Sequence, residues 1–173
     1  MNRAETVILF LVFFAALALF AESLSFGFVC DDFVLVQRVR SEGFFFSWGG
    51  PEGDIYLRPV TVLTYYLDNL LWGTDPMGYH LTNTLWHLVC AILVYALGLE
   101  VFQRKKMALA AAGVFLLLAC HSEAVTWVAG RTDLVSGALG IGSVVLFLRG
   151  RFSAIPLYLA ALLAKESVLT IPL

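Results

Sequence analysis

Two adjacent acidic residues, Asp31 and Asp32, follow the first long apolar run of the chain. That run, residues 6–26, is long enough to cross a bilayer, which takes about 20 predominantly apolar residues. The pair therefore lies at or just beyond a membrane surface, where a carboxylate loses hydration and becomes a stronger base. Such a pair suits a general base beside a partner that tunes its charge. The alternative is a polar stop that ends a membrane helix.

Three cations are expected on the same side of the membrane as this pair: Arg58, Arg131 and Lys165. An arginine guanidinium is planar, permanently charged and multidentate, which suits it to a phosphate group. For Arg131 the alternative is a surface ion pair of little energetic value with Asp133 or Glu123. Either chemistry requires these side chains to come from separate segments of the chain.

A polar stripe precedes the middle of the chain, formed by His80, Asn83, Thr84 and His87 at helical spacing. Polar groups at membrane depth are unfavourable unless they face a partner or a wet cavity. The stripe therefore indicates either contacts near a substrate or hydrogen bonds between helices, which are common in membrane bundles. Two histidines without further ligands do not define a metal site.

The composition indicates that membrane helices position these residues. The chain is 60% hydrophobic and only 14% charged, so it could not cover a water-soluble surface. We expect an all-α polytopic membrane protein with about five transmembrane helices, a single membrane domain over residues 1–173. The predicted spans are residues 6–26, 80–102, 107–120, 134–148 and 152–173. Lys165 and Glu166 interrupt the last of them, and an intramembrane charged pair is a functional hypothesis by default.

The charges of the loops predict the orientation. Residues 104–106 and 149–151 are purely basic loops, whereas residues 27–79 form a long segment rich in acids. The positive-inside rule places the basic loops and the N-terminus in the cytoplasm and the acidic segment outside. In this external loop, Pro59 is suited to begin a helix that runs to about Trp72. Its apolar residues recur at helical spacing, which predicts an amphipathic interfacial helix.

Several short motifs recur in order along the chain: Cys30-Asp31-Asp32-Phe33, Leu57-Arg58-Pro59-Val60-Thr61-Val62-Leu63-Thr64, Gly73 with Pro76-Met77-Gly78-Tyr79-His80, Asn83 and His87, Glu123-Ala124-Val125 with Gly130-Arg131-Thr132-Asp133, and Ala164-Lys165-Glu166. Together they resemble the amino-terminal membrane part of the transmembrane and tetratricopeptide-repeat O-mannosyltransferase family and its bacterial relatives, which are GT-C-fold glycosyltransferases. The family usually shows His-Pro before Glu-Ala-Val, where this chain has Leu118-Ala119. Such folds have more membrane helices and the family adds soluble repeats, so the chain is expected to be incomplete, a truncated GT-C-like domain.

The resemblance implies transfer of a hexose such as mannose from a polyprenyl- or dolichyl-phosphate donor to a hydroxyl of a protein or glycan. Transfer would occur on the periplasmic or lumenal face of a bacterial inner membrane or of the endoplasmic reticulum. An acid of the first external loop acts as the base in such enzymes, so Asp31 or Asp32 would be catalytic. Arg58, Arg131 and Lys165 would bind the donor phosphate. Substrate or supporting contacts are expected from His80, Asn83, His87, His121, Glu123, Asp133 and Glu166.

No cofactor beyond the lipid-linked sugar is expected, and no nucleic-acid partner. Side chains can neutralise a phosphate, so the chemistry requires no metal, and the role of a divalent ion stays open. A non-catalytic membrane scaffold and a lipid or solute transporter subunit are the alternatives. A transporter would place polar groups at mid-membrane on interrupted helices, whereas here they gather on the outer side. The enzyme hypothesis predicts that Asp31 or Asp32, with the three cations, lines one outward-facing cavity.

Overall fold

The structure of the chain is a computed structural model that describes residues 14–15, 17–44 and 57–171. All regular structure in these ranges is helical, as predicted. In chain order the α-helices (α) and 3-10 helices (η) are η1 (Ala21–Ser25), α2 (Asp31–Glu42), α3 (Pro59–Trp72), α4 (Pro76–Phe102), α5 (Lys105–Leu117), η3 (Ala119–His121), α6 (Ser122–Thr126), η4 (Val128–Gly130), α7 (Arg131–Leu148), α8 (Ala154–Leu162) and η5 (Glu166–Thr170).

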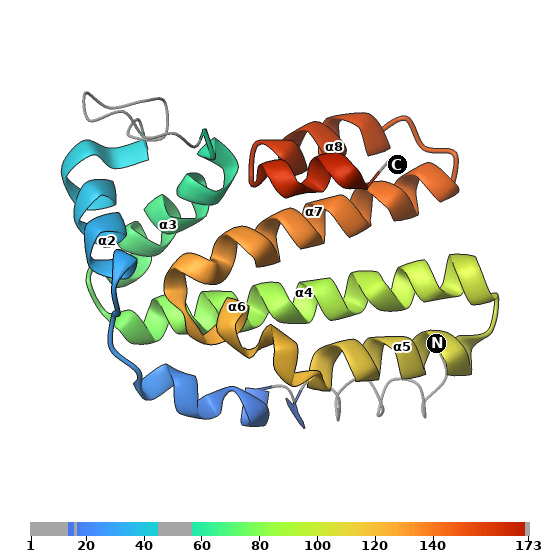
Figure 1. Cartoon of the computed structure of the whole chain (residues 1–173), viewed down its shortest axis with the longest axis horizontal. Helices are drawn as coiled ribbons and strands as arrows, with labels where there is room; N and C mark the ends of the chain where they lie inside the picture. The colour runs from blue at the N-terminus through green and yellow to red at the C-terminus, as the bar shows by residue number, and fades with distance from the viewer. Residues whose placement is uncertain (1–13, 16, 45–56, 172–173) are drawn as a thin grey trace.

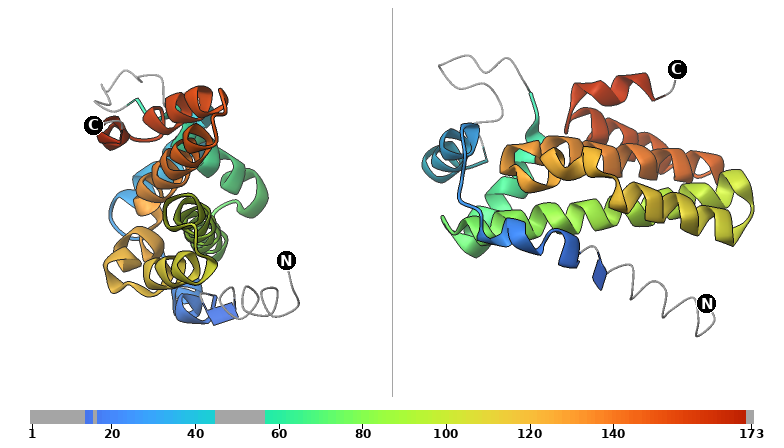
Figure 2. Two further views of the ribbon diagram at one scale, coloured as in Figure 1. Left: turned by 90° about the vertical axis from the view of Figure 1, so that its right-hand side faces the viewer. Right: turned by 60° about the horizontal axis from the view of Figure 1, so that its bottom comes forward.

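Four helices lie side by side in the order α8, α7, α4 and α5, and α2 and α3 cover one end of this row (Figures 1 and 2). The central helix α4 begins where the sequence offers a cap. Pro76 occupies its first turn, and the Asp75 side chain accepts a hydrogen bond from the Met77 backbone N–H at 3.1 Å. Its 27 residues extend about 40 Å, so the helix is longer than the predicted span 80–102.

Two of the described helical segments, Pro76–Phe102 and Val128–Leu148, are long and apolar enough to cross a membrane. Lys105–Leu117 and Ala119–Thr126, bent by 52°, would make a third if they form one span. Residues 6–13 and 16 of the predicted span 6–26 lie outside the described residues, as do residues 45–56 of the predicted external loop. The apolar helices are those of a membrane protein, and the count of five spans remains a prediction.

Residues 152–173 do not form one continuous helix in the described part, because α8 ends at Leu162 and the chain turns before η5. The carbonyl of Leu163 accepts a hydrogen bond from the Val60 N–H at 3.2 Å, and that of Ala164 accepts one from Thr61 Oγ1 at 3.0 Å. The first N–H groups of a helix have no partner within it, so the start of α3 satisfies the end of α8. This contact fixes the interruption between α8 and η5, next to Lys165.

The predicted helix from Pro59 to Trp72 is confirmed as α3, and the structure shows which of its faces packs into the protein. The side that packs into the protein contains Val62, Tyr65 and the polar Asp68. The exposed side is apolar and consists of Leu63, Leu67, Leu70 and Leu71. A helix that turns its leucines outward is suited to an apolar surrounding rather than to water.

The two basic loops lie at one end of the helix row, and α2 and α3 lie at the other (Figure 1). At the basic end, Arg149 Nε is 2.7 Å from Glu100 Oε1, which joins the ends of α7 and α4. The other basic cluster, residues 104–106, lies where the α4–α5 connection enters the first turn of α5. Both loops are therefore on one side of the bundle, as the positive-inside rule requires of two cytoplasmic loops.

Helices α4 and α5 approach closely at Gly98, where a Cβ atom would lie 2.9 Å from the Cα of Ala108. We expect Gly98→Leu to destabilise the protein by about 1–3 kcal/mol, because the larger side chain must push the helices apart. Gly113→Ala on α5 is the matched control, since a Cβ there would meet nothing within 4 Å. Thermal unfolding in detergent measures both variants, and equal unfolding temperatures would contradict the close packing.

Candidate functional site

A cavity of about 790 Å³ opens at the end of the bundle formed by α2 and α3. This volume is within the range of small-molecule sites, roughly 300–1,000 Å³. Six residues predicted from the sequence line it: Asp31, Arg58, His121, Glu123, Asp133 and Lys165. They come from four separate segments of the chain. The fold therefore brings together three acids, two cations and a histidine that are far apart in sequence.

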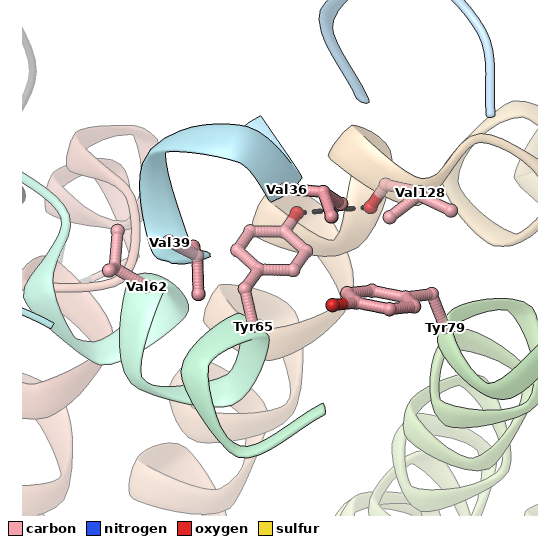
Figure 3. Close-up of a cluster of buried hydrophobic side chains, with 6 residues drawn as sticks. All are labelled: Val36, Val39, Val62, Tyr65, Tyr79 and Val128. Carbon is pink, nitrogen blue, oxygen red and sulfur yellow. Dashed lines mark hydrogen bonds between the residues drawn. The ribbon is translucent and has the colours of Figure 1, made fainter. Parts of the chain in front are cut away.

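A buried cluster holds α2 against the rest of the site (Figure 3). The Tyr65 hydroxyl of α3 donates a hydrogen bond to the Val128 carbonyl of η4 at 3.0 Å. Valines at positions i and i+3 of α2 pack around the Tyr65 ring, as an amphipathic helix requires. The members of the cluster are Val36, Val39, Val62, Tyr65, Tyr79 and Val128. The start of α2, with its two acids, is thereby fixed beside the cavity.

The two adjacent acids have different surroundings. Asp32 is fully buried, and its carboxylate oxygens accept hydrogen bonds from the Val29 N–H at 3.0 Å and the Ala129 N–H at 2.9 Å. Asp31 is exposed and lines the cavity. Of the pair, Asp31 is therefore the carboxylate that a bound molecule could reach, and Asp32 joins α2 to the segment at Ala129.

The backbone just before the acids is strained at Cys30, whose φ of 48° and ψ of −116° are unusual for a residue with a side chain. Such conformations cost about 1–3 kcal/mol and persist only where the surroundings impose them. Here the Asp32 N–H donates to the Val29 carbonyl at 3.0 Å, and the Asp32 carboxylate closes the same turn. Asp32 thus fixes the turn that directs Asp31 into the cavity.

Both predicted cations of the cavity are paired with exposed acids. Arg58 is bidentate to Glu166, with Nη2 at 2.6 Å and Nε at 3.2 Å from its carboxylate oxygens, and Lys165 contacts Asp133. The cations are the less exposed partners, at 21% for Arg58 and 23% for Lys165, against 62% for Glu166 and 54% for Asp133. Hydrogen bonds from Arg58 lower the pKa of Glu166, so this carboxylate is charged at neutral pH.

The expectation that Arg131 lines the cavity is wrong. The side chain is fully buried, and its Nη2 lies 2.6 Å from Asp68 Oδ2. Its Nε donates to Asn83 Oδ1 at 2.6 Å, Nη2 donates to the Tyr79 carbonyl at 2.9 Å, and the guanidinium lies 4.5 Å from the centre of the Tyr65 ring. Arg131 therefore joins α3, α4 and α7 from inside the protein.

The acid that pairs with Arg131 is Asp68, rather than the neighbouring Asp133 or Glu123. Burial raises the pKa of the Asp68 carboxyl, and the Arg131 guanidinium opposes that shift. Asp68 also accepts a hydrogen bond from the Thr82 hydroxyl at 2.8 Å. A buried pair with several hydrogen bonds differs from the weak surface pair that the sequence suggested as the alternative.

The polar stripe of α4 is placed between helices rather than at the cavity. His80, Asn83 and His87 are buried and do not line it. The Asn83 amide donates to the Trp127 carbonyl at 2.9 Å, and His87 Nε2 lies 3.2 Å from the Leu116 carbonyl, an acceptor that makes this nitrogen the donor. The bonds of Asn83 and His87 favour the alternative of hydrogen bonds that hold the bundle together.

Sequence reasoning missed other residues of the cavity, among them Arg38, Thr61, Tyr65, Cys120 and Trp127. Trp127 follows the Glu123-Ala124-Val125 motif closely, and an aromatic ring in that position was a usable signal. The partner of Arg131 had no such signal. Within the described ranges, no group of three or more His, Cys, Asp or Glu side chains is placed to hold a metal ion.

The curated proteins to which the chain is similar include three protein O-mannosyl-transferases. The chain is 31% identical to the protein O-mannosyl-transferase Tmtc1 of Drosophila melanogaster over 90% of its length, 33% identical to the mouse protein O-mannosyl-transferase TMTC3 over 60%, and 30% identical to the protein O-mannosyl-transferase F38B6.6 of Caenorhabditis elegans over 67%. The chain is similar to protein O-mannosyl-transferases. It spans 20%, 12% and 18% of the lengths of these three relatives. No protein-family model and no solved structure matches it.

Proposed function

We propose that the cavity is the donor and acceptor site of a membrane glycosyltransferase that moves mannose from a polyprenyl-phosphate donor to a protein hydroxyl. The observation that carries this is the convergence of Asp31, Arg58 and Lys165 on one cavity. A transfer from a lipid phosphate needs a base for the acceptor and cations for the leaving group. The similarity to proteins named protein O-mannosyl-transferases supports both the reaction class and the sugar.

The reaction is a single displacement. The acceptor oxygen attacks the anomeric carbon while its proton passes to the Asp31 carboxylate. The bond between the anomeric carbon and the phosphate oxygen breaks, and its electron pair stays on that oxygen. The products are the inverted mannoside and a polyprenyl monophosphate with one more negative charge. Asp31 then releases the proton to water. Arg58 and Lys165 stabilise the charge that develops on the phosphate.

The remaining cavity residues suit contacts to the two substrates. His121 and Glu123 offer polar groups near Asp31, and Trp127 offers an aromatic ring, against which the apolar face of a sugar packs well. Arg131 acts at a distance in this proposal. It fixes the start of α7 against α3 and α4, and therefore the position of the cavity wall that follows it in sequence.

The cavity would open toward the periplasm or lumen. Residues of α2 and α3 line it, and these helices lie at the end of the bundle remote from the two basic loops (Figure 1), which the positive-inside rule assigns to the cytoplasm. The exposed leucines of α3 lie at the same end as the cavity. They would place α3 against the outer leaflet, so that a lipid-linked donor reaches the site from the membrane.

Replacement of the cavity cations tests the proposal. We expect Arg58→Gln and Lys165→Gln each to raise the KM for a polyprenyl-phosphate mannose donor about 10- to 100-fold, since hydrogen bonds to charged groups contribute about 1.5–3 kcal/mol. Arg149→Gln is the matched control, because it removes an arginine from an ion pair at the other end of the bundle. Unchanged donor KM in both cavity variants would contradict the proposed phosphate site.

A further inference from the structure

The ion pairs of Arg58 and Lys165 differ from the buried pair of Arg131 with Asp68, because their acids are exposed. Their partners, Glu166 and Asp133, keep most of their surface in contact with solvent. Exposed ion pairs contribute only about 0–1 kcal/mol. A carboxylate that leaves such a pair recovers its hydration at once, so its release costs little.

The backbone segments that carry the two cations do not depend on the acids. Arg58 lies just before α3, and Lys165 lies between α8 and η5. These two segments are joined through the backbone, by the Val60 N–H to the Leu163 carbonyl and by Thr61 Oγ1 to the Ala164 carbonyl. The backbone that carries the cations is therefore fixed independently of the acids.

A phosphate changes its demand for these cations during the proposed reaction. The donor is a phosphodiester with one negative charge, and the leaving monophosphate carries about −1.5 to −2 at neutral pH. The monophosphate competes better for a cation than a single carboxylate does, so both pairs would open as its charge develops. After transfer, the same acids compete with the product for Arg58 and Lys165.

We propose that Glu166 and Asp133 are displaceable counter-ions that limit how tightly the site holds the lipid monophosphate product. They exchange with the phosphate on Arg58 and Lys165 and recover these cations as the product leaves. This inference rests on the proposed function, because it assigns the phosphate to those two cations. It gives the acids of the Ala164-Lys165-Glu166 and Arg131-Thr132-Asp133 motifs a role separate from catalysis.

The test measures binding of polyprenyl monophosphate to the full-length protein in lipid nanodiscs, which needs no turnover. We expect the Kd to fall about three- to fivefold in Glu166→Gln and in Asp133→Asn, equivalent to about 0.6–1 kcal/mol each, the upper part of the range for an exposed pair. Glu100→Gln is the control, because Glu100 forms an exposed pair with Arg149 remote from the cavity. Inhibition of transfer by added polyprenyl monophosphate should strengthen by the same factor. Either cavity variant alone carries the test if the other does not fold.

A second variant separates exchange from a general effect of charge. In an Arg58→Gln background, Glu166→Gln should change the Kd less than twofold, because the cation for which Glu166 competes is gone. Tightening of equal size in both backgrounds would overturn the inference, as would an unchanged or weaker Kd in the single variants. If the unmodified protein neither binds polyprenyl monophosphate nor transfers mannose, the proposed function is overturned, and this inference with it. Saturable binding by the unmodified protein without tightening would overturn the inference alone.

Discussion

Replacing Asp31 with asparagine is expected to lower the turnover number for mannose transfer about 10²–10⁴-fold, the usual contribution of a general base. The amide cannot accept the acceptor proton, while its size and position are nearly unchanged. Asp31 lines the cavity but makes no ion pair with Arg58 or Lys165, so donor binding should persist. Kinetics in membranes with matched protein levels, together with donor binding, measure both quantities.

The neighbouring acid supplies the control for this variant. Asp32→Asn should weaken the turn at Val29, because an amide has one acceptor oxygen where the carboxylate accepts from both Val29 and Ala129. We therefore expect Asp32→Asn to lower the unfolding temperature and Asp31→Asn to leave it unchanged. Full turnover in Asp31→Asn, with loss in Asp32→Asn at unchanged stability, would reverse the two assignments.

Replacing Asp68 with alanine is expected to destabilise the protein by about 3–5 kcal/mol, because it leaves the buried Arg131 guanidinium without a counter-charge. The loss should appear as a large fall in the unfolding temperature in detergent. Glu100→Gln is the control, since its exposed pair with Arg149 contributes about 0–1 kcal/mol.

A double variant shows whether the charge is the cause. Arg131→Met in the Asp68→Ala background removes the uncompensated charge and should recover part of the stability. If Asp68→Ala costs no more than the surface control, the buried pair does not support the bundle. If the second substitution adds its own full cost, the loss arises from packing and not from charge.

Local signals in the sequence predicted the helices that begin and end at caps. Helix α3 begins at Pro59 and ends before Gly73, as the sequence indicates, because these residues set the backbone conformation by themselves. The cavity residues Arg58 and Lys165 were predicted from their charge and from the side of the membrane assigned to them. Their convergence was a consequence of the fold that only the structure could report.

Interactions between distant segments explain what the sequence did not predict. Arg131 was interpreted as a loop residue facing a phosphate, yet it begins α7 and is buried, because Asp68 from α3 neutralises it. Nothing in the spacing of the two residues marks them as partners. The end of α8 at Leu162 also depends on a distant segment. The carbonyls that follow it accept hydrogen bonds from Val60 and Thr61.

The most direct test of the account is transfer of labelled mannose from polyprenyl-phosphate mannose to a protein acceptor, in proteoliposomes that carry the full-length protein. We expect inverted O-mannosyl product with the unmodified protein, little product with Asp31→Asn, and donor binding in both. Equal transfer with and without Asp31 would contradict it, as would transfer that uses only a nucleotide-linked sugar.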